Sequence, residues 1–281
     1  MFDWLVEISL WLLGLLLFAV LVLAILGGYA LRRRNDRIDA SIGECHNDTQ
    51  EGYIVSAVLT LLGLLIGFTF ALAVDRYEER RLLVIDGANA VETLYLRAQL
   101  LDEPHRTRIS TVTTLYTENQ IRLANAEGTE GERLLERNHH LIRMLWTVTV
   151  PAFDTIRGID FSSSFVDSVN QVIALDTARK ANRRATIPGP VFAVLFVYTI
   201  VAAGILGYVL IGRRGRVVGS LLLGLFILAL LLLGDFNRPI SGVVNESQEP
   251  MERVLAAMRA SPPGTFEGLR TLPSTLPAPP E

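Results

Sequence analysis

Four long apolar runs without a charged residue limit what this chain can fold into. They cover Ile8 to Leu31, Gly52 to Val74, Ala185 to Gly212 and Val217 to Gly234. Each approaches the roughly 20 residues that a helix needs to cross about 30 Å of hydrocarbon. In lipid, only helices and closed barrels satisfy every backbone amide. The pattern therefore predicts an all-α integral membrane protein with four spans.

The first run is expected to remain as a membrane anchor. It follows Asp3 and Glu7 instead of a basic segment, and no small-residue cleavage site precedes Arg32. It is also longer than the apolar part of a signal peptide. Cleavage is therefore not expected, and the run is counted as span one.

The polar segments divide the chain into five parts. Spans one and two occupy residues 1–75, a helical extramembrane domain 76–187, spans three and four 188–234, a docking turn and short helix 235–260, and a Pro-rich disordered tail 261–281. A loop is expected at Arg32–Glu51, between spans one and two. A second, shorter loop is expected at Arg213–Arg216, between spans three and four. The extramembrane domain is therefore inserted between spans two and three.

Helical periodicity predicts the structure of the insert. Apolar residues recur three and four apart from Arg76 to Leu101, which indicates a helix continuous with span two. Three further helices are expected: one from Pro104 until Gly128 and Gly131 break it, one from about Glu132 to Arg157 with Pro151 kinking or ending it, and one capped by Ser162, Ser163 or Ser164.

A short helix is also predicted after span four. Ser247 and Pro250 suit its cap and first turn. Its apolar stripe consists of Met251, Val254, Leu255 and Met258. This stripe is expected to dock on the insert.

Enzymatic, metal-binding and nucleic-acid-binding functions find little support. His105, His139 and His140 lie far from any nucleophile, and no catalytic or phosphate-binding motif occurs. Cys45 is the single cysteine, which excludes a thiolate cluster and predicts an idle loop thiol. The acidic residues of the first loop match no EF-hand: Asp36, Asp39, Glu44 and Asp48. A net charge of -3 without a basic aromatic tract argues against nucleic acid. We therefore expect no enzyme, no cofactor and no metal.

Span two carries a stripe of residues suited to lining a pore. Thr60, Leu64 and Phe68 lie along one side, followed by Ala71 or Leu72 and then by Asp75 at the end of the span. Gly63 and Gly67 allow close approach of neighbouring helices, as several copies around an axis require. Ordinary packing within one subunit would give the same spacing, so both interpretations remain open.

Charged residues end two of the spans on the same side of the membrane. Asp75 and Arg76 follow span two, and Asp235 and Arg238 follow span four. Ion pairs between them would fix the helix ends, whereas charges at a pore mouth would set ion preference. The sequence permits both roles at once.

The distribution of basic residues does not decide which side of the membrane the insert occupies. Seven basic residues lie in the two short loops and seven lie near the span ends within the insert. Only the convention that long loops translocate regardless of charge favours cytoplasmic short loops.

A family resemblance adds to these observations. The run GFTFALAVDRYEERRLLVIDGANAV resembles the second-span signature of bacterial bestrophins. The chain as a whole resembles a bacterial bestrophin-like family over about Gly43 to Met258, leaving out the first span and the tail. The matching features are His46, Asn47 and Asp48 before span two, the insert, and Asp235, Arg238, Pro239 and Gly242 after span four.

The resemblance implies a homopentameric ion channel in the inner cell membrane that conducts small ions passively. Span two of every subunit would surround the axial pore, with the hydrophobic neck of the family on Thr60, Leu64 and Phe68. Thr60 replaces an apolar residue, which makes this constriction easier to wet. Calcium gating is not expected, since only Asp235, Glu246 and Glu249 remain of the acidic cluster of animal bestrophins.

Two points stay open under this resemblance. Bestrophins keep the insert and both termini in the cytoplasm, in conflict with the arginines of the short loops. The alternative function is a non-conducting membrane scaffold or sensor, in which the helical domain binds a partner and the spans only anchor it.

Overall fold

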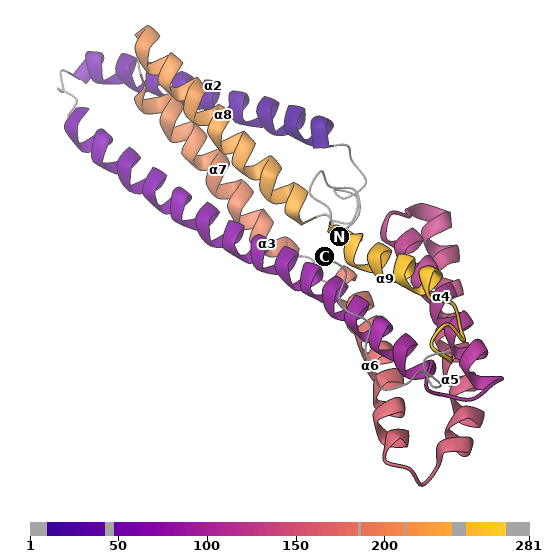
Figure 1. Cartoon of the computed structure of the whole chain (residues 1–281). Coiled ribbons are helices and arrows are strands. Elements are labelled where there is room, and N and C mark those ends of the chain that lie inside the picture. The colour runs from indigo at the N-terminus through magenta and orange to yellow at the C-terminus, as the bar shows by residue number, and fades with distance from the viewer. Residues whose placement is uncertain (1–9, 43–47, 185–186, 211, 238–245, 268–281) are drawn as a thin grey trace, which may run out of the picture. The chain divides into compact units, whose positions relative to one another are not determined.

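The structure, a computed structural model, describes residues 10–42, 48–184, 187–210, 212–237 and 246–267 (Figure 1). Every regular element within these ranges is a helix, which confirms the all-α prediction for them. The helices are α2 (Leu10–Ile42), α3 (Asp48–Ala98), α4 (His105–Ala124), α5 (Gly128–Ile156), α6 (Phe161–Arg184), α7 (Gly189–Val209), α8 (Gly212–Phe236) and α9 (Glu249–Ala260).

Four of these helices contain segments that are long and apolar enough to cross a membrane. The segments are Gly14–Arg37, Gly52–Ala98, Gly189–Val209 and Val217–Phe236. They lie in α2, α3, α7 and α8, in agreement with the four predicted spans.

The chain forms two compact units, each described by itself below. The spanning unit consists of Met1–Tyr77 and Thr186–Val244, and the helical unit consists of Glu78–Ala185 and Asn245–Glu281. The boundary between Tyr77 and Glu78 falls inside α3, so no turn separates the two units at this point.

The closest helix pair of the spanning unit is α2 with α7. A Cβ atom on Gly28 would lie 2.0 Å from the carbonyl oxygen of Gly204, and one on Gly207 would lie 2.1 Å from that of Ile25. Only glycine fits at these two positions, and the backbones therefore touch without intervening side chains, as in other small-residue interfaces of membrane helices.

A buried arginine fixes the end of this helix pair. Arg32 donates from Nη1 to the carbonyl oxygen of Tyr208 over 3.0 Å, and its guanidinium lies 5.6 Å from the centre of the Tyr208 ring. Tyr208 belongs to the last turn of α7, where unpaired carbonyls favour a cation. The arginine that follows span one therefore caps span three.

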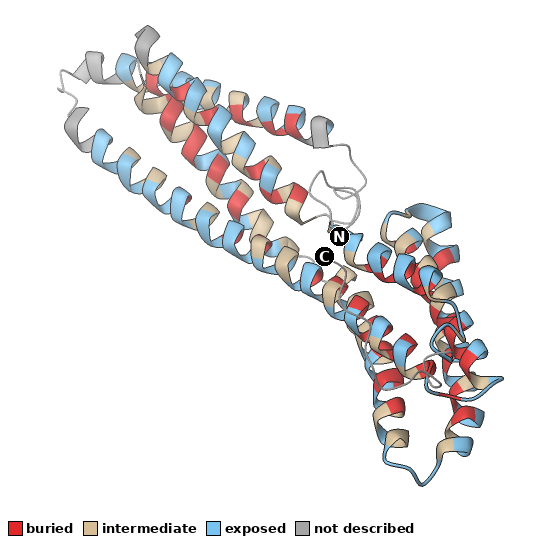
Figure 2. Ribbon diagram, in the orientation of Figure 1, coloured by how far each residue is buried: buried red, intermediate tan, exposed pale blue. Residues whose placement is uncertain are grey.

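The helical unit has a continuous apolar core. Residues of α3, α4, α5, α6 and α9 contribute to it, including Leu94, Ile109, Leu145, Phe165 and Met251. Figure 2 shows these helices with buried residues along one side and exposed residues along the other. Met251, Val254, Leu255 and Met258 are all buried, which confirms that α9 docks on the insert helices.

The structure corrects the two predicted loops between spans. The helix of span one continues through the arginines to Ile42, and α3 begins at Asp48, so most of Arg32–Glu51 is helical. Similarly, α8 begins at Gly212, and Arg213–Arg216 belongs to its first turns. Arginine is a good helix former, and charge marks the exit from the membrane without ending a helix.

Two helix starts in the insert also differ from the prediction. The third insert helix begins at Gly128, which has the left-handed φ of 55° that glycine tolerates, instead of near Glu132. This helix ends at Ile156, close to the predicted Arg157, and Pro151 lies inside it without ending it. α6 begins at Phe161, so Ser162–Ser164 lie within its first turn and none of them is its cap.

Candidate pore-lining stripe of α3

The predicted stripe of α3 lies on the outside of the spanning unit. Leu64 is 53% exposed and Phe68 is 65% exposed. Thr60 and Asp75 are exposed as well, and the hydroxyl of Thr60 donates to the carbonyl oxygen of Ser56 over 2.8 Å. These four side chains therefore take no part in the core of their own chain.

The opposite side of α3 packs on the other spans. Leu62 is fully buried, and Ala73 joins it in a cluster with residues of α2, α7 and α8. Thr69 is buried with its hydroxyl bonded to the carbonyl oxygen of Leu65 over 2.7 Å. The helix thus presents one face to its own unit and leaves the candidate stripe on the other.

The two glycines beside the stripe, Gly63 and Gly67, are not in contact with other described helices of the same chain. A Cβ atom on Gly63 or Gly67 would meet nothing within 4 Å. This differs from Gly28 and Gly207, where the chain itself occupies the space. Packing within one subunit therefore does not account for these glycines.

The charged ends of spans two and four differ in their surroundings. Asp235 is only 5% exposed, while Asp75 and Arg76 are exposed. Next to Asp235, the Phe236 ring makes edge contacts with Phe70 at 5.7 Å and with Tyr77 at 5.8 Å between centroids. Arg76 and Asp235 both have interaction partners. Arg238 lies outside the described residues.

Asn237 ties the end of span four to the start of span three. Its side-chain oxygen accepts a hydrogen bond from the backbone nitrogen of Ile187 over 2.7 Å. The sequence did not suggest this contact, because an asparagine after an apolar run is usually interpreted as a turn residue.

Among the residues that the structure describes, the histidines and acidic residues considered for chemistry do not assemble into a site. His139 and His140 are exposed and His105 is half-buried, while Cys45, His46 and Asn47 lie outside the described residues. Within the described ranges, no group of three His, Cys, Asp or Glu side chains is placed to hold a metal ion. Glu246 forms an ion pair with Arg80, and Glu249 lies 3.7 Å from Arg253.

A buried polar network in the helical unit was missed by sequence reasoning. The carboxylate of Asp176 accepts hydrogen bonds from Tyr116 over 3.2 Å, Gln120 over 2.7 Å and Asn138 over 2.8 Å. Lys180 approaches the second carboxylate oxygen at 2.5 Å. The buried Asp176 carboxylate requires these hydrogen bonds and this ion pair, because an unpaired buried charge is strongly destabilising.

The surroundings of this network shift the pKa values of Tyr116 and Arg179. Burial raises the pKa of the Tyr116 hydroxyl well above its usual value of 10.0, and the Asp176 carboxylate raises it further. Burial also lowers the pKa of the Arg179 guanidinium, against the opposite effect of Tyr116, Asp176 and Glu246. The cluster joins three helices, α4, α5 and α6, and Arg179 extends it to Gln248 in the segment before α9. Its role in the described structure is to hold these parts together.

Comparison with known proteins decides the family. The profile of the Bestrophin-like domain matches residues 13–251, which is most of the chain. The chain belongs to the Bestrophin-like family. Since the match begins at residue 13, the first span of this Bestrophin-like protein is part of the family domain. The resemblance predicted from Gly43 onward was therefore too short at its N-terminal side.

Solved structures show the same fold. A bacterial bestrophin homologue from Klebsiella pneumoniae carrying one substitution is 14% identical to this Bestrophin-like chain, with a TM-score of 0.67 over 87% of this chain and 99% of that one. A second variant is 15% identical, with a TM-score of 0.65 over 86% and 98%. A structure described as a membrane protein is 13% identical, also with a TM-score of 0.65 over 86% and 98%. No curated protein matches this sequence.

Proposed function

We propose that this Bestrophin-like protein is an ion channel. Identical subunits, five by analogy with the family, form a ring in the inner cell membrane, with α3 of each subunit next to the axis. Leu64 and Phe68 form the hydrophobic neck, Thr60 extends it, and Asp75 lies at the mouth. Ions move passively down their gradient, and the protein is not an enzyme.

The observation that carries this proposal is the outward exposure of the stripe. Large apolar side chains at Leu64 and Phe68, with empty space at Gly63 and Gly67, match a helix that packs against copies of itself around an axis. Exposure to lipid alone would explain the apolar residues, but it gives no reason for Asp75 on the same stripe. A water-filled pore mouth explains the position of Asp75, because intramembrane carboxylates generally face water or a partner.

The neck is tested by ion flux into liposomes containing the purified full-length protein. Replacing both Leu64 and Phe68 with alanine widens the constriction and lowers its resistance to wetting, so flux should rise. The matched control is Phe18→Ala with Leu225→Ala, which removes the same two side-chain types from exposed positions on α2 and α8. The control pair should leave flux at the wild-type level.

Two results would contradict parts of this proposal. One, unchanged flux in the neck variant while its assembly is intact by size-exclusion chromatography, would mean that Leu64 and Phe68 only pack and would remove the neck from the proposed channel. The other is an absence of flux in the wild-type protein and in both variants, which would favour a scaffold or sensor whose helical unit binds a partner.

A further inference from the structure

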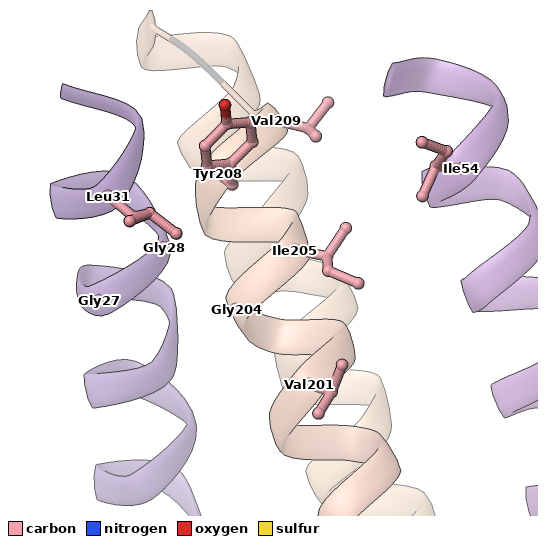
Figure 3. A pocket seen from close by; sticks show the side chains of 9 residues that line it. All are labelled: Gly27, Gly28, Leu31, Ile54, Val201, Gly204, Ile205, Tyr208 and Val209. Carbon is pink, nitrogen blue, oxygen red and sulfur yellow. The ribbon is translucent and has the colours of Figure 1, made fainter. Parts of the chain in front are cut away.

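An open apolar groove of about 580 Å³ lies on the surface of the spanning unit. Its floor includes Gly27 and Gly28 of α2 and Gly204 of α7, and Leu31 and Ile205 line its sides. Figure 3 shows Val201, Ile205 and Val209 pointing from α7 toward α3, which contributes Ile54. No residue of the proposed pore stripe lines this groove, so it is a separate feature.

One end of the groove is polar. The hydroxyl of Tyr208 accepts a hydrogen bond from Nδ2 of Asn35 over 3.3 Å, which holds the ring at this end. Arg34 follows Gly27 by seven residues, so both lie on the same side of α2 two turns apart. Arg34 is exposed and makes no ion pair with any residue that the structure describes. Arg32, by contrast, is buried and bonded to Tyr208.

The shape and lining of the groove suit an apolar chain. The groove extends along α7 from Val201 to Val209, about 12 Å at 1.5 Å per residue. Its lining consists of glycine and aliphatic residues together with Tyr208 at one end, so the groove offers apolar contacts along its length and a polar group only at that end.

We propose that the groove binds one acyl chain of an anionic phospholipid. The chain lies over Gly27 and Gly204, and the phosphate of the headgroup contacts the Arg34 guanidinium, with the Tyr208 hydroxyl beside it. The charge of Arg34 and the apolar floor below it match the two ends of such a lipid. Anionic headgroups are attracted to basic residues at a membrane surface. This inference requires only that the helices lie in a membrane, and it does not depend on ion conduction.

The test measures lipid binding to the purified full-length protein by native mass spectrometry. Phosphatidylglycerol and phosphatidylcholine with identical acyl chains are titrated separately. The wild-type protein should bind phosphatidylglycerol more tightly. Arg34→Gln should weaken phosphatidylglycerol binding about fivefold. It should weaken phosphatidylcholine binding less, because the choline cation offsets the charge of the same phosphate. Arg33→Gln is the matched control, because Arg33 is exposed on another side of the same helix, and it should retain the wild-type preference.

A second pair of variants tests the apolar part. A Cβ atom on Gly27 would meet nothing within 4 Å, so Gly27→Leu should place its side chain in the groove and preserve the fold. It should lower the binding of both lipids several-fold. The control is Gly224→Leu, an exposed position on α8 with equally open space.

Three outcomes would overturn the proposal. Equal losses for Arg34→Gln and Arg33→Gln would mean that the lipid binds only through general surface charge. Unchanged binding in Gly27→Leu would mean that the groove holds no acyl chain. A change in oligomeric state in Gly27→Leu without any loss of lipid would assign the groove to a helix of a second copy.

Discussion

A single carboxylate, that of Asp176, holds several buried donors in the helical unit. Three neutral groups and Lys180 converge on it from different parts of the chain, and Asp176 is only 2% exposed. No sequence pattern marks these partners, because they are 38 to 60 residues away from Asp176 in three of the four cases. Such a network depends on tertiary structure alone.

The raised pKa of Tyr116 makes the stability of the protein sensitive to alkaline pH. The unfolded tyrosine loses its proton near pH 10, while the folded one stays neutral. The contribution of Tyr116 to the free energy of unfolding is therefore complete below pH 10. It decreases above pH 10, by up to about 1.4 kcal/mol per pH unit. Thermal unfolding of the full chain in detergent between about pH 9 and pH 11.5 should show this slope.

The comparison variant Tyr116→Phe should show a shallower slope in the same pH range. A residual slope is expected, because burial also raises the pKa of Tyr95. Tyr53→Phe, at a tyrosine that is 72% exposed, serves as the control and should keep the wild-type slope. If stability falls with pH equally steeply in the wild-type protein and in Tyr116→Phe, the alkaline loss of stability does not come from Tyr116.

The carboxylates Asp235 and Asp75 should respond differently to neutralisation. Asp235 is buried and partnered, so Asp235→Asn removes charged interactions and should destabilise the protein by about 1–3 kcal/mol. Asp75 is exposed, so Asp75→Asn should preserve stability but change the ratio of cation to anion permeability. Unfolding curves and reversal potentials measure these two effects. Equal stability of both variants, with unchanged permeability, would exclude both roles.

Among the elements, the pair of α2 and α7 depends most strictly on residue size. The two neighbouring glycines of α2 differ completely in what surrounds them: Gly27 borders open space, and Gly28 touches the backbone of Gly204. The sequence alone does not distinguish the two glycines of this pair. The structure shows that only the second position sets the distance between the helices.

Substitution of Gly28 should therefore destabilise the protein, while substitution of Gly27 should not. Gly28→Ala places a methyl group where a carbonyl oxygen lies 2.0 Å away, and separating the helices should cost about 1–3 kcal/mol. It should also weaken the contact between Arg32 and Tyr208. Gly27→Ala is the matched control. Unfolding of both variants in detergent measures the difference, and equal midpoints would show that the close approach is unnecessary.

The elements also show which features the sequence could predict. Apolar spacing correctly predicted that span two continues into the insert as one helix, α3. It also predicted the four buried residues of α9. Charges and serines were poorer guides to helix ends. α2 continues through Arg32, because charge ends membrane burial without ending hydrogen bonding, and α6 begins before Ser162.

The candidate stripe was predictable only in part. The spacing of Thr60, Leu64 and Phe68 follows from helical geometry, and their exposure agrees with it. Whether they face an axis depends on other copies of the chain, which a single sequence does not encode. The pore therefore stays a prediction.

At the scale of the whole molecule, the proposed channel requires a closed ring. The purified full-length protein should form a pentamer with α3 innermost, because one chain cannot enclose an axial pore. Mass photometry in detergent measures the number of subunits, and cysteine substitution at Thr60 should give crosslinks between subunits. A monomer or a two-fold dimer without such crosslinks would eliminate the pore and leave the scaffold function.

The order of segments in the helical unit has a consequence for synthesis of the protein. Its core includes Phe165 of α6 and Met251 of α9, yet α7 and α8 lie between them in the chain. A ribosome must therefore complete two spans before the residues that cover this core exist. Until then the part of this core that Met251, Val254 and Met258 cover stays open and available to chaperones or proteases. A chain that terminates early, before α9, should be degraded even though all four of its spans are present.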